Sequence, residues 1–435
     1  MNSRFDIQHS KLAREAATLV SGNVLAQIIS LAAYFALTRI FSSEDYGLYA
    51  IFYSYIEVLI ILSTCKYELA IVAADNDREA NTLARFTLRL NAIVSTILLT
   101  VALVLWLTGT LPGNFSQLGW MVLLIPPMVF LCGTSRVYSF LFNRQHGYRT
   151  MAVSEAVNAA AGALTKIALG LLGMLQAGMP VGTVAGRAMG NLVYRLKNSE
   201  LKKRNSEEAV ASNTPNHPIS NSELSAVAHK HRNFPMYVAT KDFVDSFSAN
   251  LPFLWLALYF NRADVGLFSL ALTFTFRPVN ILNVAFEQVL YARTAEGVRE
   301  KQSISRMIKR FLLGINALAL PFFVLAWFVA EPVFTFCFGW EGCGVYVQAL
   351  LPMVFLMLSS LSLTFISNVF GTQRIEFYFH LVLLALRVAA IAVGIAASSF
   401  LLAIRLYATA GALVAASLLV WYLWQVRRYE HSLKQ

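Results

Sequence analysis

Apolar runs of about 20 residues recur along almost the whole chain and alternate with polar connections that are mostly short. As a helix, each run is long enough to cross a hydrocarbon core of about 30 Å. The pattern predicts twelve membrane spans. They lie approximately at residues 17–41, 47–72, 86–108, 118–141, 150–172, 178–196, 236–260, 265–288, 310–337, 345–370, 375–398 and 402–426. The chain is therefore predicted to be an all-α integral membrane protein.

Composition agrees with this pattern, and charge adds an orientation. The 435 residues are 57 % hydrophobic and only 14 % charged, far from the profile of a soluble globular domain. Most of the 35 Lys and Arg fall in the termini and the even-numbered connections, and such charge collects on the cytoplasmic side. Both termini are predicted to be cytoplasmic. Because topology accounts for the net charge of +11, we expect no nucleic-acid partner.

One connection is much longer than the others. Residues 197–232 are basic at both ends, with a middle rich in Ser, Asn and Pro, a composition that cannot bury enough apolar surface to fold. This segment divides the spans six and six. The predicted organisation is a cytoplasmic N-terminal segment (1–16), a six-helix bundle (17–196), a cytoplasmic linker (197–232), a second six-helix bundle (233–428) and a cytoplasmic tail (429–435).

The two halves repeat each other. A shift of 219 residues lays DYGLY at residues 45–49 on DVGLF at 264–268, and Tyr67-Glu68 on Phe286-Glu287. The matched segments run in the same direction across the membrane, so the repeat is parallel, with an axis near the membrane normal. The predicted architecture is two pseudo-symmetric six-helix bundles around a central cavity, as in many alternating-access transporters.

The first and seventh spans each carry one polar stripe with the spacing i, i+4, i+7, i+11 of a helix face. The stripes are Asn23, Gln27, Ser30 and Tyr34 in the first span, and Lys241, Asp245, Ser248 and Pro252 in the seventh. We expect these polar groups to line the cytoplasmic lip of the cavity. The alternative for Lys241 and Asp245 is a simple intrahelical pair, and Asp242 is left near the interface.

Three arginines fall near mid-depth of the predicted spans: Arg187, Arg277 and Arg387. Charged residues there normally face a bundle interior or a water-filled cavity, and a guanidinium binds phosphate bidentately. Neither Arg277 nor Arg387 has an acidic partner nearby in the sequence, so both are candidates to bind an anion, with Asn280 on the face of Arg277. Arg187 lies among three glycines spaced four apart, where close helix packing is the alternative.

Acidic residues in or near the spans are candidates for ion coupling. They are Glu57, Asp245 and Glu287. The alternative for Glu287 is a local pair with Arg293, and Glu68 has the same alternative with Lys66. In the fifth span, Glu155 and Lys166 either satisfy each other or a neighbouring helix, or serve function.

Motifs of soluble-enzyme chemistry are absent from the sequence. It has no Walker A loop, no dinucleotide fingerprint and no zinc-spaced Cys/His cluster. We therefore predict no cofactor and no metal site, with transport driven by an ion gradient or the membrane potential. All seven histidines map to the cytoplasmic side. Cys337 and Cys343 flank a short outer loop, and either form a disulfide or stay buried thiols.

Several longer phrases carry a family resemblance. They are DYGLYAIFYSYIEVLI, KYELAIV, FPMYVATKDFVDSFSANLP, DVGLFSLALTFTFRPVNILNVAFEQVLYART and residues 344–373. Together they resemble the polysaccharide transporters of the multidrug/oligosaccharidyl-lipid/polysaccharide (MOP) exporter superfamily, and most of all its Wzx-like flippases. The resemblance implies the MATE-like MOP fold, a V-shaped pair of six-helix bundles. Twelve spans rather than fourteen argue against the lipid II flippase branch.

The resemblance also implies a cargo and a direction. Such flippases move an undecaprenyl-pyrophosphate-linked oligosaccharide, a repeat unit of O-antigen, capsule or exopolysaccharide, to the periplasmic leaflet of the bacterial inner membrane. The residues in suitable positions to bind the pyrophosphate and sugar are Arg277, Arg387, Lys241, Arg187, Asn23, Gln27 and Asn280. The candidates for coupling to H⁺ or Na⁺ are Glu57, Asp245 and Glu287. A polysaccharide polymerase and a chain-length regulator are the expected protein partners. Lys241 and Asp242 depart from the hydroxyl and amide residues that we associate with this part of the family.

Two alternatives compete with a flippase. A cation-coupled drug exporter of the same superfamily would need an acidic excess in its cavity, whereas arginine prevails at mid-depth here. A membrane enzyme such as a polysaccharide polymerase or ligase would need a sizeable periplasmic catalytic loop, whereas the outer connections are short and nearly uncharged. Both observations favour a transporter that is not an enzyme.

Overall fold

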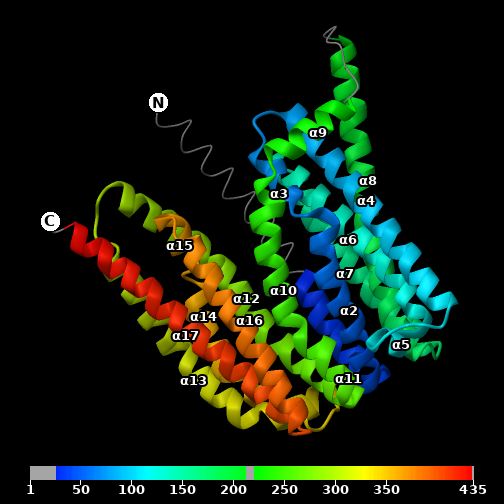
Figure 1. Cartoon of the computed structure of the whole chain (residues 1–435), viewed down its shortest axis with the longest axis vertical. Coiled ribbons are helices and arrows are strands. Elements are labelled where there is room, and N and C mark those ends of the chain that lie inside the picture. Colours follow the sequence, from blue (N-terminus) through cyan, green and yellow to red (C-terminus); the bar gives the residue numbers. More distant parts are fainter. Residues whose placement is uncertain (1–25, 212–219, 434–435) are drawn as a thin grey trace. The chain divides into compact units, whose positions relative to one another are not determined.

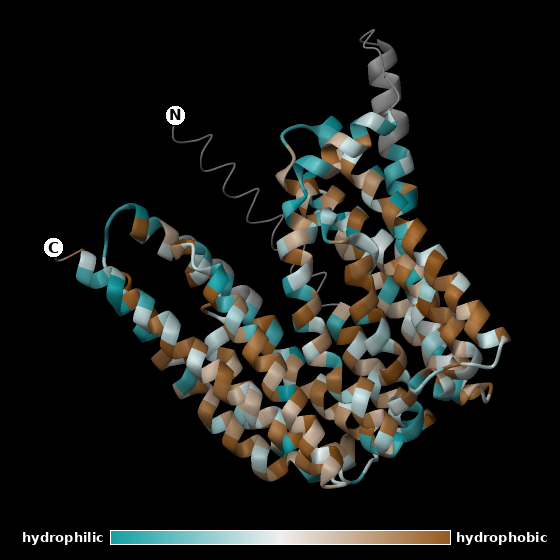
Figure 2. Cartoon of the chain, viewed as in Figure 1, coloured by the Kyte–Doolittle hydropathy of each residue, from teal (hydrophilic) through white to brown (hydrophobic). Residues whose placement is uncertain are grey.

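The computed structural model describes residues 26–211 and 220–433 of the chain, and within these ranges the regular structure is helical throughout (Figure 1). Contacts divide the chain into two compact units, and the division falls between Phe243 and Val244. Hydrophobic residues run along the long helices of both units, whereas hydrophilic residues gather around α9 and at helix ends (Figure 2). The predicted all-α class is confirmed.

Unit 1 begins, in its described part, with an apolar helix over Ala26–Ile40. The elements that follow are α2 (Ser43–Thr64), α3 (Tyr67–Ala73), α4 (Asp77–Leu107), α5 (Asn114–Leu118), the 3₁₀ helix η1 (Gly119–Leu124), α6 (Ile125–Arg144), α7 (Tyr148–Leu171), α8 (Leu175–Ala211), α9 (Asn221–Lys230) and the π-helix η2 (Phe234–Ala239).

Helix α10 (Thr240–Leu251) contains the division between the units. Unit 2 continues with the π-helix η3 (Pro252–Leu256), α11 (Ala257–Tyr259), α12 (Arg262–Arg299), α13 (Ser305–Phe338), α14 (Cys343–Leu361), α15 (Phe365–Phe370), α16 (Gln373–Ala396) and α17 (Phe400–Ser432).

Eight stretches among the described helices are long and apolar enough to cross a membrane. They are Ser43–Thr64, Asp77–Leu107, Asn114–Arg144, Arg262–Asn283, Ser305–Phe338, Cys343–Phe370, Gln373–Ala396 and Phe400–Ser432. The described parts of the other four predicted spans fall mostly on helices that are shorter, more polar or interrupted. The chain is a multi-pass membrane protein, and eight of its twelve predicted spans meet the length and composition expected of a crossing helix.

The span predicted at residues 47–72 extends too far, because the crossing helix α2 ends at Thr64 and the chain breaks before α3. Cys65 and Lys66 adopt left-handed backbone conformations, with φ of 47° and 60°, and separate α2 from α3. The Cys65 N–H still donates to the carbonyl of Ile61 and so closes the last turn of α2. Apolar periodicity does not register a two-residue break of this kind.

The internal repeat extends through the helices of the two units. Helices α2 and α12 start 219 residues apart, and each is capped by the side chain just before it, Ser42 or Asn261. From α4 and α13 onward, the offset between equivalent residues becomes 225. It relates α7 (148–171) to α16 (373–396) end for end, and the start of α8 at residue 175 to that of α17 at residue 400.

The same offset relates a buried polar contact in each unit. In unit 1, Asn91 on α4 donates to Thr134 Oγ1 on α6 at 3.4 Å. In unit 2, Asn316 on α13 donates to Ser359 Oγ on α14 at 2.9 Å. The pentapeptide PMVFL occurs at residues 127–131 and again at 352–356, on these same helices. A buried amide needs a hydrogen-bond partner. In both units an equivalent hydroxyl on the neighbouring helix is that partner.

The prediction that residues 197–232 would not fold is wrong for their described part. Helix α8 continues to Ala211, and α9 packs on the start of α4. Lys230 Nζ lies 2.7 Å from Asp75 Oδ2 and 2.6 Å from Glu79 Oε1, and Arg78 pairs with Glu223 at 2.8 Å. Ion pairs hold this helix together with apolar contacts, because Leu224 is buried and Val227 and Ala228 pack on the buried cluster around Tyr67. The Pro-rich middle of the segment lies outside the described residues.

Glu79 is the centre of the α9–α4 contact and precedes the predicted span at 86–108. Hydrogen bonds from Lys230 and His231 lower the pKa of Glu79 to about 2. A lowered folded-state pKa stabilises the contact above the ordinary glutamate value and loses that stabilisation as pH falls through the folded value. The contact should therefore persist at neutral pH and weaken only between about pH 4.5 and pH 2.

We predict that Glu79→Gln loosens α9 at pH 7 and removes this acid transition. Hydrogen–deuterium exchange of residues 221–230 across pH 2.5 to 7 would measure both effects. Glu223→Gln is the control, because its pair with Arg78 is exposed and contributes little. Equal protection of α9 in the wild type and Glu79→Gln at pH 7 would contradict the assignment.

Candidate functional site

The stretch that carries the polar residues of the seventh predicted span is an interrupted helix. Helix α10 is bounded by two π-helical turns, η2 and η3. Pro235 and Pro252 lie in the first positions of these turns. Proline has no N–H for the helical ladder, so the backbone widens there. Such π-turns are often found at functional sites, and here they bracket the residues that contact α16.

Two pairs of side chains join α10 to α16 within unit 2. His380 Nδ1 lies 2.6 Å from Asp245 Oδ1, and Arg387 Nη1 donates to Ser248 Oγ at 3.2 Å. Asp245 and Ser248 are one turn apart, whereas His380 and Arg387 are two turns apart, so both pairs lie along one line of contact. We call these four residues the α10–α16 seam.

Arg387 is buried in this seam, with 5 % of its surface exposed. Its guanidinium stacks over the Tyr407 ring at 4.2 Å from the centroid. The Nε atom is buried without a hydrogen-bond partner. Among the described residues no carboxylate pairs with Arg387, whose contacts are the Ser248 hydroxyl and this ring. The charge is therefore held without a counter-charge.

The repeat shows that Arg387 is not part of the shared framework. At the same offset of 225, unit 1 has Gly162, which packs against Gly186 on α8; a Cβ added at Gly162 would lie 3.6 Å from the Gly186 Cα. Unit 2 keeps the second glycine as Gly411, and a Cβ added there would lie 3.5 Å from Arg387 Nη2. Unit 2 thus places a guanidinium where unit 1 has only close helix packing.

His380 is the seam residue that the sequence did not single out. It lies near two carboxylates, Asp245 at 2.6 Å and Glu376 at 3.8 Å. No local motif predicts the contact between His380 and Asp245, because the two residues are far apart in the sequence. The one available signal was the repeat, since His380 is the 225-residue counterpart of Glu155, another charged residue at a helix contact.

Unit 1 has a polar group of its own. Arg187 Nη1 lies 3.0 Å from Glu155 Oε1 and 3.3 Å from Ser135 Oγ. Glu155 and Lys166 do not satisfy each other: Lys166 instead contacts Tyr49, with Nζ 4.8 Å from the ring centroid. The packing alternative for Arg187 also holds, because a Cβ added at Gly186 would lie 2.6 Å from a backbone oxygen of α7. Arg187 is therefore both closely packed and neutralised.

Two acids near the α2–α3 break have partners that sequence proximity did not indicate. Lys66 Nζ lies 2.5 Å from Asp242 Oδ2, so Asp242 is not simply left at the interface. Glu68, 1 % exposed, lies 3.9 Å from Arg136 instead of pairing with Lys66. These partners are brought together by helix packing rather than by proximity along the chain.

The other predicted site residues are spread over both units. Asn23 lies outside the described residues, and Gln27 is half-buried on the helix Ala26–Ile40. The half-buried positions also include Glu57 on α2, Lys241 on α10, and Arg277 and Glu287 on α12, while Asn280 is exposed. Glu287 Oε1 accepts a hydrogen bond from Thr364 at 3.0 Å. Cys337 and Cys343 are free thiols.

Comparisons with known proteins agree with this architecture. The family model described as "Polysaccharide biosynthesis protein" matches residues 209–343. The lipid II flippase MurJ in an inward closed conformation is similar in structure, with a TM-score of 0.71 over 95 % of this chain and 91 % of that one, at 10 % identity. An inward-facing multidrug resistance MATE family transporter of the MOP superfamily gives 0.66 over 93 % and 96 %, at 12 % identity.

A third structure, a MOP superfamily transporter from Pyrococcus furiosus, gives a TM-score of 0.59 over 96 % of each chain at 12 % identity. No curated protein matches the sequence. At such identities the structural likeness shows the fold, which is that of the MOP superfamily. Together with the family match, it confirms the predicted resemblance to the polysaccharide transporters of that superfamily.

The Arg187–Glu155 pair can be tested by a double-mutant cycle. We predict that Arg187→Leu and Glu155→Leu each lower the thermal midpoint in detergent, because each leaves a partly buried charge unpaired. The double variant should recover part of the loss, with a coupling energy of about 1–3 kcal/mol. Lys166→Leu combined with Glu155→Leu should be additive. Additive effects of the Arg187 and Glu155 changes would show that the two charges do not interact.

Proposed function

We propose that this chain moves an undecaprenyl-pyrophosphate-linked oligosaccharide repeat unit from the cytoplasmic to the periplasmic leaflet of a bacterial inner membrane. The movement would occur by alternating access, with both termini cytoplasmic and an ion gradient as the driving force. The match to a polysaccharide biosynthesis family and the fold shared with a lipid II flippase support this proposal. No bond is broken in such a cycle, so the glycolipid should be recovered unmodified.

The observation that carries the proposal is the unpaired guanidinium of Arg387. Burying a charge without a counter-charge is costly, and the described chain gives Arg387 only a hydroxyl and an aromatic ring. An anionic pyrophosphate would supply the missing charge and suits the planar fork of arginine. Separation of α10 from α16 would expose Arg387, and closure would bury it again.

Pocket polarity also separates the flippase from a drug exporter. The Pyrococcus furiosus transporter is described as having a binding pocket of reverse polarity that suggests a different function, so charge and function are linked within this fold. A cationic drug would be repelled by Arg387, and the nearby acid Asp245 already pairs with His380. The seam therefore favours an anionic cargo.

The proposed coupling site is Asp245 with His380, in preference to Glu57 and Glu287. Imidazole titrates near pH 6.5 in water, within the range of physiological pH gradients. Protonated His380 would bind Asp245 as an ion pair, whereas neutral His380 would bind it only through a hydrogen bond. A proton gained or lost here would change how strongly α10 is held to α16, next to the cargo-binding arginine.

We predict that Arg387→Gln blocks delivery of repeat units while leaving protein abundance unchanged. The test is complementation of a strain that lacks its own flippase, with measurement of surface polysaccharide and of accumulated lipid-linked intermediates. Arg405→Gln is the matched control, because Arg405 is exposed on α17. Ser248→Ala keeps the charge and should reduce delivery much less. Normal surface polysaccharide in Arg387→Gln would refute the cargo assignment.

We further predict that His380→Gln and Asp245→Asn flatten the pH dependence of transport. In vesicles, the wild-type rate should change with pH, because protonation of His380 turns its hydrogen bond to Asp245 into an ion pair. Glu287→Gln should keep the wild-type profile. If Asp245→Asn transports with an unchanged pH profile, its pair with His380 is structural and the coupling ion is bound elsewhere.

A further inference from the structure

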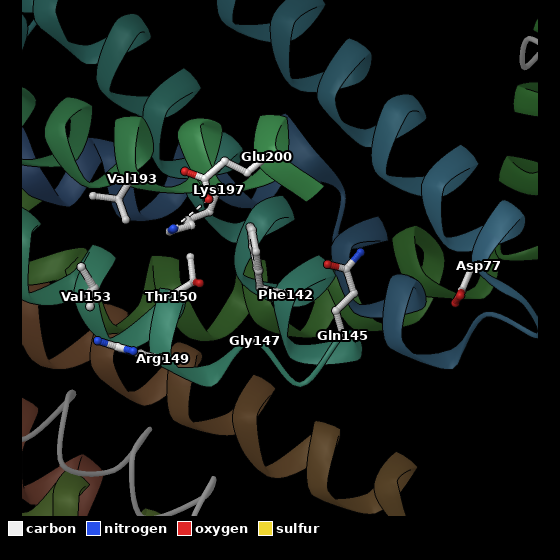
Figure 3. A pocket seen from close by; sticks show the side chains of 10 residues that line it. All are labelled: Asp77, Phe142, Gln145, Gly147, Arg149, Thr150, Val153, Val193, Lys197 and Glu200. Atoms are coloured by element: carbon white, nitrogen blue, oxygen red, sulfur yellow. Dashed lines mark hydrogen bonds and ion pairs between the residues drawn. The ribbon is translucent and has the colours of Figure 1, made fainter. Parts of the chain in front are cut away.

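A second polar site lies at one end of unit 1, and none of its lining residues belongs to the proposed cargo or coupling sites. It is a cavity of about 900 Å³ between the end of α6, the start of α7, the middle of α8 and the start of α4 (Figure 3). The helix ends around it belong to the connections that charge predicts to be cytoplasmic. The cavity therefore lies where a membrane-bound headgroup would meet unit 1.

The lining changes in character from one end of the cavity to the other. Figure 3 shows Val153 and Val193 at one end and Asp77 at the other, with Thr150 and Lys197 close to the valines and Gln145 nearer to Asp77. Both valines fall in predicted membrane spans, whereas Gln145 and Asp77 fall in the connections. From the valines toward Asp77, the lining side chains are first apolar, then cationic and hydroxyl-bearing, and finally an amide and a carboxylate.

The charges of the lining differ in availability. Lys197 pairs with Glu200 at 2.8 Å, and Asp77 is bound by Arg144 Nε at 3.1 Å from outside the lining. Arg149 is exposed and makes no hydrogen bond or ion pair to any residue that the structure describes. Arg149 is thus the cation best placed to take a ligand, with the Thr150 hydroxyl beside it.

We propose that this cavity binds the headgroup of a polyprenyl-pyrophosphate-linked sugar before the sugar reaches the α10–α16 seam. The assignment rests on the proposed function for the cargo class. The lipid chain leaves past Val153 and Val193, the pyrophosphate binds Arg149 and Lys197, and sugar hydroxyls bind Gln145 and Asp77.

Size and polarity favour this ligand over an ordinary phospholipid. The cavity volume is near the upper end for small-molecule sites, about 300–1,000 Å³, and exceeds what a single phosphate headgroup needs. An anionic phospholipid gains nothing from the carboxylate of Asp77, which Arg144 binds from outside the lining. A sugar uses both Asp77 and Gln145, because its hydroxyls can donate to a carboxylate and accept from an amide.

The test measures binding in the full-length Arg387→Gln protein in nanodiscs, which removes the proposed seam site from the measurement. The probe is a short-chain polyprenyl-pyrophosphate-linked N-acetylhexosamine. The same polyprenyl pyrophosphate without sugar and phosphatidylglycerol are the comparison lipids. Native mass spectrometry reports each bound lipid, and a thermal midpoint checks that every variant is folded.

Four changes give distinct expected results. Arg149→Gln should weaken both pyrophosphate lipids about tenfold or more, because a charged hydrogen bond is lost. Asp77→Asn should weaken only the sugar-bearing probe. Glu200→Gln should tighten both, because it frees Lys197 and removes a charge that repels phosphate. Arg195→Gln on the same helix, outside the lining, should change neither.

Three results would overturn the inference. They are no probe binding in the Arg387→Gln background, unchanged binding in Arg149→Gln, and phosphatidylglycerol binding as tight as that of the probe. The last would assign the cavity to a structural phospholipid. The proposed function is judged separately, by delivery in cells, so normal delivery with Arg387→Gln would refute that proposal without deciding what this cavity binds.

Discussion

A charge inside a membrane protein needs a partner, and this constraint organises both units. Asp242 pairs with Lys66, Asp245 with His380 and Arg187 with Glu155. Each pair joins different elements of the fold, so satisfying the charge also fixes the packing. Arg387 differs from these three pairs, since its partners among the described residues are a hydroxyl and a ring. Under the proposed function, an anionic cargo would supply the missing counter-charge.

The internal repeat separates framework from function. Helices α7 and α16 have equivalent bounds, and the Asn91–Thr134 and Asn316–Ser359 contacts are equivalent too. These matches build two similar scaffolds. The scaffolds differ at the equivalent positions Gly162 and Arg387, where unit 1 has close helix packing and unit 2 has a buried guanidinium. The proposed function assigns binding to the second of these positions.

Backbone interruptions and ion pairs fix the position of the elements around α10. The π-turns on either side of α10 present its polar face without a continuous helical ladder. Helix α9 is fastened to α4 through Glu79, whose low pKa keeps the contact charged throughout the physiological range. The segment that leads into α10 is therefore an anchored element of unit 1, although its composition is that of a flexible linker.

Much of this protein was determined by sequence alone. Apolar run length predicted the membrane class, the DxGL repeat predicted two related halves, and charges inside the spans identified Arg387 and Asp245 as candidates, because each of these signals can be read from residue types and spacing. The tertiary structure decided which charged side chains pair with each other. His380 beside Asp245, Lys66 with Asp242, and α9 on α4 are contacts between parts of the chain that are far apart in sequence. Helical periodicity shows which face a residue occupies, but only packing shows what that face meets.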